Sequence, residues 1–288
     1  MITGNVSKLH LVQFDKKDIP AFIELSKSVG WDYDEREIDT VLSAGNVFGH
    51  KNFKGKIISS AAIIPYEKSV ASIGMVIVNK EYRGIGLGKE ATQQCIDSHS
   101  SNIAIMLIAT EEGKLLYEKM GFQIVDRVHK YICNTFSPSH LSHGTVTIER
   151  FRAGDLHKVI ELDEAAFGDR RSGFLTQRIN QSEECIVVRN STGTIVGFGL
   201  STITPINLII GPIVAIDPQV ASIILDKLAI RHKGKLRIDV PSSNDVFREA
   251  IENCGFLKVS SPPVMMLTST KMPGRNGELF GIAAQVFG

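Results

Sequence analysis

One stretch near residue 80 restricts the possible folds of this chain more than any other. An apolar strand ending at Val78 runs into a turn that contains Gly84, Gly86 and Gly88, and a helix follows. Glycine at every second position lets successive backbone N–H groups point to one side of a turn, which forms a concave site for an anion. The first N–H groups of the helix have no intrahelical partner and face the same place. The stretch therefore predicts a turn that binds a phosphate-bearing ligand.

We expect this ligand to touch the end of the strand, the turn and the first helical turn. Arg83 and Lys89 would add positive charge beside the glycines. The complete set of predicted contacts is Val76, Ile77, Val78, Arg83, Gly84, Ile85, Gly86, Leu87, Gly88, Lys89 and, further along the chain, Tyr117.

Two common phosphate-binding motifs fit this turn poorly. A P-loop would need Gly where Arg83 stands and a hydroxyl side chain where Glu90 stands. A dinucleotide fingerprint does match residues 86–91, and Glu111 follows near the end of the next expected strand. However, that fingerprint opens a βαβ unit, whereas two helices and several antiparallel strands are predicted before this turn. A nicotinamide-dependent enzyme therefore stays an alternative with weak support.

A third motif fits better. Residues 76–88 resemble the pyrophosphate-binding motif of the Gcn5-related N-acetyltransferase (GNAT) family, Gln/Arg-x-x-Gly-x-Gly/Ala, with Arg83, Gly86 and Gly88 at the pattern positions. Residues 115–122 resemble the Tyr-Glu-Lys-x-Gly-Phe helix end of the same family. Both motifs occur in the family's order, about 30 residues apart, and the resemblance covers roughly residues 1–134.

The resemblance implies an α+β fold with a mixed, mostly antiparallel twisted sheet flanked by helices. It also implies acetyl-CoA as co-substrate and transfer of an acetyl group to a primary amine, of a small molecule or, as a second choice, of a protein. The alternatives are a sensor that only binds coenzyme A and a transferase of another acyl group.

The resemblance assigns the role of general acid to Tyr117. A phenol is protonated at neutral pH yet acidic enough to give its proton to a departing thiolate. The alternative is a tyrosine at the edge of the core with no chemical duty. The base is left open: Glu81, Glu111 and Glu112 lie near in sequence, and a water chain could take the proton instead.

The acceptor amine has a candidate site at Trp31, Asp32 and Tyr33, in the connection between the first two expected helices. In proteins resembling this family, that connection overhangs the acceptor side of the cleft, where aromatic rings and carboxylates can hold a cation. The alternative is structural: Trp31 packs the two helices together and Asp34 caps the second one.

Composition excludes several other classes of protein. Among 288 residues the formal net charge is +1, which gives no reason to expect nucleic acid or a membrane surface as partner. Four cysteines stand without Cys-x-x-Cys spacing, and the first residues contain no leader pattern. We therefore expect a cytoplasmic protein with a small-molecule partner, which the family resemblance implies is an amine. We also expect a monomer or homodimer that uses no metal.

The second half reads as a degenerate copy of the first. Residues 135–143 form a polar linker, whose His140 and His143 lack further metal ligands, and residues 144–288 repeat the order of strands and helices. Aligning Gly255 with Gly121 sets an offset of 255 − 121 = 134. Opposite Arg83, Gly84, Gly86, Gly88 and Tyr117, this offset places Asp217, Pro218, Val220, Ser222 and Ile251.

The functional features are therefore lost: Pro218 removes an N–H donor, Val220 cannot adopt the left-handed conformations of glycine without cost, and Asp217 would repel a phosphate. The second half also resembles the carboxy-terminal acetyltransferase-like domain that follows an active one in a group of bacterial proteins, through residues 211–217, 238–241 and 279–284. We expect it to form a wall of the acceptor cleft and to set selectivity, with the strand of Met265 and Met266 packing at the domain boundary.

Overall fold

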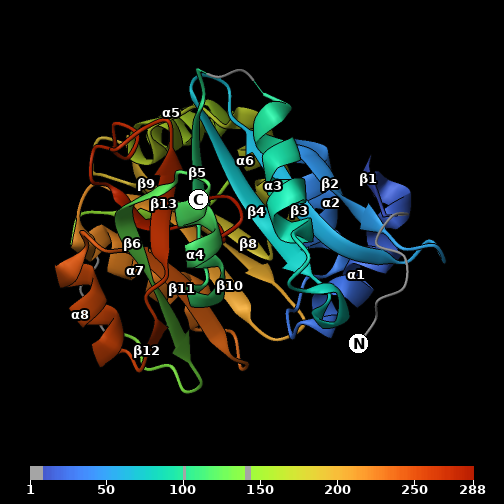
Figure 1. Cartoon of the computed structure of the whole chain (residues 1–288). Helices are drawn as coiled ribbons and strands as arrows, with labels where there is room; N and C mark the ends of the chain where they lie inside the picture. Colours follow the sequence, from blue (N-terminus) through green and yellow to red (C-terminus); the bar gives the residue numbers. More distant parts are fainter. Residues whose placement is uncertain (1–8, 100–101, 140–143) are drawn as a thin grey trace.

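The computed structural model describes residues 9–99, 102–139 and 144–288, and within them the strands form one continuous sheet of fourteen (Figure 1). The linker histidines His140 and His143 lie outside the described residues. The strands are β1 (His10–Gln13), β2 (Asn46–Lys51), β3 (Ile57–Pro65), β4 (Val70–Val78), β5 (Ala104–Ile108), β6 (Gln123–Cys133), β7 (Thr147–Arg150), β8 (Glu184–Arg189), β9 (Ile195–Ile203), β10 (Leu208–Ala215), β11 (Leu236–Pro241), β12 (Leu257–Ser260), β13 (Pro263–Leu267) and β14 (Leu279–Gly281). The helices are α1 (Ile19–Ser28), α2 (Glu35–Ala44), α3 (Leu87–Asp97), α4 (Glu111–Lys119), α5 (Leu156–Phe167), α6 (Ser172–Gln181), α7 (Pro218–Ala229) and α8 (Asp245–Asn253).

Helices cover both faces of the first-half sheet, because its strands carry apolar side chains on both sides. Ala61 and Ile63 of β3 join the cluster around α3, whereas Ala62 and Ile64 join the cluster around α1 and α2. The strand order is β1-β2-β3-β4-β5, antiparallel except for the parallel pair β4–β5. The expected mixed, mostly antiparallel sheet flanked by helices is confirmed.

The second half repeats this arrangement with β7 to β11, and its parallel pair is β10–β11. The offset of 134 holds for the last helix, since 245 − 111 = 134, and the residue opposite Tyr117 is the fully buried Ile251. It fails for the helix after the turn, since 218 − 87 = 131. The counterpart of Gly86 at the start of that helix is therefore Asp217, and the expected counterpart Val220 is wrong by three residues.

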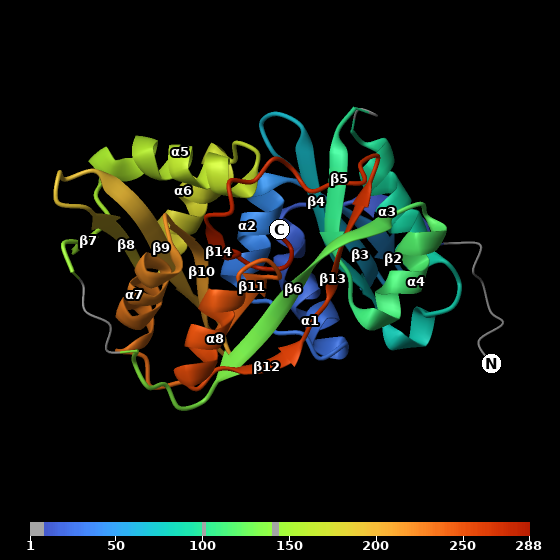
Figure 2. The ribbon, with the colours of Figure 1, turned by 90° about the vertical axis from the view of Figure 1, so that its left-hand side faces the viewer.

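The two halves exchange their last strands. β13 comes from the second half by sequence, but it lies between β5 and β6, with Val264 opposite Ile108. In return, the long strand β6 leaves the first half and pairs with β11 from Val128 to Cys133 (Figure 2). The division at residues 134 to 144 thus separates two stretches of sequence, while the sheet passes from one half to the other.

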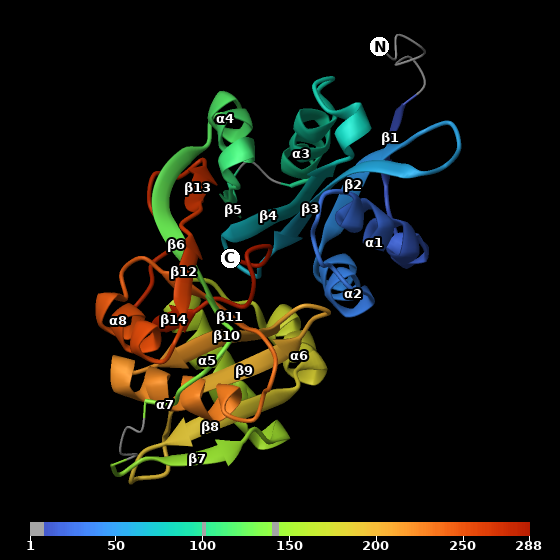
Figure 3. The same cartoon turned by 90° about the horizontal axis from the view of Figure 1, so that it is seen from below.

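The last residues of the chain lie between the two halves (Figure 3). Ser72 Oγ donates a hydrogen bond to the carbonyl oxygen of Val286 at 2.9 Å, and Tyr66 Oη donates to that of Phe287 at 2.5 Å. Arg171, fully buried and paired with Asp163, also reaches the Phe287 carbonyl at 3.3 Å. Both halves therefore hold this segment in a fixed place. None of the helices in the described ranges is long and apolar enough to span a membrane.

Candidate active site

The sheet opens beside the second part of β4. β4 pairs with β5 only from Val70 to Ile73, although it continues to Val78. A bulge in its pairing with β3 follows, where Met75 has a φ of 51°, and Ser60 Oγ donates to the Met75 carbonyl at 2.8 Å. Because β5 turns away, the edge of β4 from Met75 onward has no strand partner on that side. Its N–H groups can serve a ligand.

The glycine-rich turn brings an uncapped helix to this open edge. Gly86 is the residue before α3, with φ of 91°, and no side chain caps the helix. The first intrahelical bond is donated by Glu90 N to the Gly86 carbonyl at 3.0 Å, which leaves the preceding N–H groups free. An added Cβ at Gly88 would lie 3.2 Å from a methyl of Val78, so a small residue is needed where α3 approaches β4. This end of the helix suits an anion.

The second half has lost this feature in a specific way. The equivalent helix α7 is capped by Asp217, whose side chain accepts a hydrogen bond from Val220 N at 2.8 Å, and Pro218 stands in its first turn. One helix amide is thus satisfied by the cap, Pro218 offers none, and a carboxylate occupies the place where a phosphate would bind.

Tyr117 lies on α4 across the opening from β4 and is 7% exposed. Its ring packs on Phe122, and a Cβ at Gly113 would come within 3.1 Å of it, so a glycine one turn earlier makes room for the phenol. Burial raises the pKa of Tyr117 above its ordinary value, and nearby Cys95 adds to this shift. The phenol is therefore protonated at neutral pH and can act as a proton donor.

A cavity of about 1050 Å³ joins these features to the other half of the chain. Of the residues predicted to hold a ligand, the lining includes Trp31, Asp32, Tyr33, Val76, Ile77, Val78, Arg83, Gly84, Gly86, Leu87, Gly88, Lys89 and Tyr117. Ile85 is exposed and does not line the cavity. Of the candidate bases, Glu111 and Glu112 line it and Glu81 does not. Glu112 lies 3.4 Å from Arg83 in an exposed ion pair.

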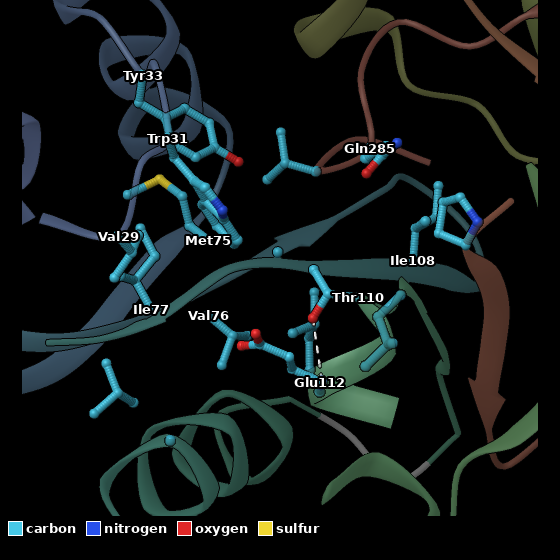
Figure 4. Close-up of a pocket in the computed structure, with 18 of the residues that line it drawn as sticks. Val29, Trp31, Tyr33, Met75, Val76, Ile77, Ile108, Thr110, Glu112 and Gln285 are labelled. Carbon is cyan, nitrogen blue, oxygen red and sulfur yellow. Dashed lines mark hydrogen bonds between the residues drawn. The ribbon is translucent and has the colours of Figure 1, made fainter. Parts of the chain in front are cut away.

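The aromatic residues lie on one side of β4 (Figure 4). The rings of Trp31 and Tyr33, with centroids 6.0 Å apart, lie beside Met75, and Gln285 lies on the same side of β4, across the cavity from them. Burial raises the pKa of Tyr33, and the charge of Glu37 acts in the same direction. The expected cap is also present, because Asp34 Oδ1 accepts from Glu37 N at 2.9 Å. Asp34 thus caps α2, and it lines the cavity together with Trp31, Asp32 and Tyr33.

Four polar residues that line the cavity come from distant parts of the chain and were not anticipated from the sequence. Lys130 lies on β6, Thr204 and Arg237 come from the second half, and Gln285 belongs to the last residues of the chain. No motif surrounds them, because they meet only through the strand exchange and the buried tail. The one signal in the sequence was Lys130, the single lysine in a strand whose other residues are about half apolar.

An α+β sheet opened at one strand, with an uncapped helix and a buried tyrosine around the opening, defines an acyltransferase. The chain belongs to the Gcn5-related N-acetyltransferase family. Two acetyltransferase (GNAT) domain models match, at residues 44–124 and 159–281. Over 279 residues the chain is 38% identical to an uncharacterized N-acetyltransferase, YitH of Bacillus subtilis (strain 168), covering 96% of this chain and 98% of that protein.

Solved structures show the same fold. A candidate acetyltransferase from Pyrococcus horikoshii superposes with a TM-score of 0.83 at 23% identity, over 99% of this chain and 98% of that one. A tandem GNAT protein from the clavulanic acid biosynthesis pathway gives a TM-score of 0.67 at 12% identity, over 90% and 98%. The resemblance inferred from the two motifs, including the tandem form, is confirmed.

Proposed function

We propose that this protein transfers an acetyl group from acetyl-CoA to a primary amine of a small molecule, with one working site in its first half. Enzymes of this family use acetyl-CoA as co-substrate. The observation that carries the proposal is that one cavity contains the open edge of β4, the uncapped start of α3 and the protonated Tyr117. These three features all come from the first half, and the second half lines only the remaining part of the cavity.

Each part of the site has a role that its chemistry suits. The free N–H groups at the start of α3 would hold the diphosphate, with Lys89 beside them. The N–H groups on the open edge of β4 can donate to amide groups of the bound co-substrate and to a carbonyl oxygen that gains negative charge during transfer. The co-substrate supplies an activated acetyl group as a thioester. Tyr117 would give its proton to the sulfur that leaves.

The acceptor would enter from the side of Trp31, Asp32 and Tyr33, where the second half closes the cavity with Thr204 and Arg237. We propose that residues 144–288 serve as this wall and do not bind a second co-substrate, because Asp217 and Pro218 occupy the start of α7.

Release of free thiol from acetyl-CoA, followed with a panel of primary amines, tests the proposal. We expect amine-dependent release and tight binding of acetyl-CoA in calorimetry. Binding without release for every amine would instead indicate a sensor of coenzyme A. Faster release from a different acyl-CoA would indicate another donor, and binding of NAD(P) in place of acetyl-CoA would contradict the proposal altogether.

A further inference from the structure

The acceptor end of the cavity contains charges of both signs that have no ion-pair partner among the described residues. Lys130 Nζ makes no hydrogen bond or ion pair with any described residue, although its stem is packed between β11 and the cavity. Asp32 has one weak contact, from Thr204 Oγ1 at 3.5 Å, and no cation lies within ion-pair distance among the described residues. Both residues are half-buried, so a ligand in the cavity could supply the partner that each lacks.

Arg237 is positioned more firmly than Lys130. Its Nε donates to Asp239 Oδ2 at 2.8 Å, and Asp239 is fully buried and also accepts from Gln285 Nε2 at 2.8 Å. The side chain of Arg237 is only 14% exposed, and its two terminal nitrogens have no hydrogen-bond partner among the described residues. Asp239 thus fixes the guanidinium in one orientation and leaves its outer edge free. A free guanidinium edge matches the two oxygens of a carboxylate.

The charged groups around the cavity shift the pKa of Lys130, although no described residue forms a hydrogen bond or an ion pair with it. Burial lowers the pKa of Lys130, Arg237 lowers it further, and Asp239 and Asp32 oppose the shift. The two cations come from β6 and β11, whereas Asp32 comes from the connection between α1 and α2 beside Trp31 and Tyr33. A ligand in this part of the cavity would therefore meet a carboxylate beside aromatic rings and, from other elements, two cations.

We propose that the acceptor is a small amine that also carries a carboxylate, as an amino acid does, with Asp32 facing its amine and Lys130 and Arg237 facing its carboxylate. A simple cationic amine would leave both cations unmatched and would be repelled by them. A neutral hydrophobic amine would leave all three charges without partners. The inference rests on the proposed function, since it names the substrate class of that same site.

Matched pairs of amines test the proposal: phenylalanine against phenethylamine, leucine against isopentylamine, and lysine against cadaverine. The thiol-release assay gives kcat/KM for both members of each pair. We expect the amino acid to be favoured by about tenfold or more, which is the effect of one charge-assisted hydrogen bond. Amines without the carboxylate reacting as well as the amino acids would overturn the inference and leave the proposed function standing.

Variants locate the recognition in named residues. Lys130→Met should reduce the preference for the amino acid by about tenfold through KM, with kcat little changed. Asp32→Asn should raise KM for both members of a pair. Lys258→Met is the matched control, since Lys258 lies on β12 beside β6 but is exposed and outside the cavity. Arg237 is unsuitable as the first target, because its loss would leave buried Asp239 without a counter-ion.

A binding measurement keeps the proposal open to refutation if no amine is turned over. Calorimetry of the protein saturated with coenzyme A should detect the amino acids and show weaker binding in Lys130→Met. Absence of thiol release with such binding would refute the proposed transfer but support the ligand class. Absence of amino acid binding, or equal binding by Lys130→Met, would overturn the ligand class itself.

Discussion

Gly74 of β4 and Val286 near the end of the chain are in contact so close that no side chain fits between them. A Cβ at Gly74 would lie 2.8 Å from the Cα of Val286 and 2.4 Å from one of its methyl groups. Both residues line the cavity, next to the point where β4 separates from β5. The second half thus reaches the opening of the first-half sheet through its last residues.

Gly74→Ala should destabilise the protein by about 1–3 kcal/mol, because the added methyl forces the tail out of its position. Thermal and denaturant unfolding measure the loss. Gly154→Ala is the matched control, since nothing lies within 4 Å of a Cβ there and its backbone is not in the left-handed region. Equal stability of the two variants would show that the tail is not held against β4.

Gly86→Val should weaken acetyl-CoA binding by about tenfold or more, because the side chain would occupy the space of the diphosphate at the start of α3. Calorimetry measures the affinity. Gly55→Val is the control: Gly55 has a similar positive φ and open surroundings, but it lies in the β2–β3 turn outside the cavity. Both variants should lose stability from backbone strain. Unchanged affinity in Gly86→Val would refute the proposed diphosphate site.

Tyr117→Phe should reduce kcat by about 10²–10⁴-fold while acetyl-CoA affinity stays near the wild-type value. The phenol oxygen is lost but the ring still packs on Phe122. Thiol release at saturating acetyl-CoA gives kcat, and calorimetry gives the affinity. An unchanged kcat would mean that another group or water protonates the thiolate.

Arg171→Met should destabilise the protein by about 3–5 kcal/mol, because it leaves the carboxylate of Asp163 buried without its counter-ion. The double variant Asp163→Leu with Arg171→Met should recover much of that loss. Arg170→Met is the control, since Arg170 pairs with Glu67 and Glu164 in a partly exposed ion pair whose contribution is about 0–1 kcal/mol. Similar losses of stability in Arg171→Met and Arg170→Met would contradict the argument that burial of the Asp163–Arg171 pair makes the loss of one partner costly.

The protein should lose stability as the pH falls from about 7 towards 5, in part through His50. Burial lowers the pKa of His50 in the folded chain, and Glu90, 3.2 Å away, opposes this shift. Below the ordinary histidine value of about 6.5, the unfolded chain binds a proton at this site more readily than the folded chain does. Acidification therefore favours unfolding until the folded pKa is also passed.

Urea unfolding at several pH values should show a shallower dependence for His50→Gln than for the wild type. His157→Gln is the control, because His157 is exposed on α5. Identical pH profiles for His50→Gln and the wild type would remove His50 from this account.

Local patterns predicted much of the first half. The helix α3 after the glycine-rich turn was expected, and the cap of α2 was predicted at Asp34. The degenerate character of the second half was also visible, although counting along the chain misplaced the counterpart of Gly86. The loops between equivalent elements differ in length in the two halves, so one offset does not hold along the whole chain. Only the observed positions of the helices give the correct counterpart of Gly86.

The sequence by itself determined the glycine-rich turn, the tyrosine helix, the family and the tandem order, because each depends on residues near one another in the chain. Only the tertiary structure decided which strands pair, since β13 meets β5 across 264 − 108 = 156 residues, and a strand's side-chain pattern does not name its neighbour. The acceptor end was decided the same way. Asp32, Lys130, Arg237 and Gln285 become one site only when the exchanged strands and the buried tail bring distant residues together.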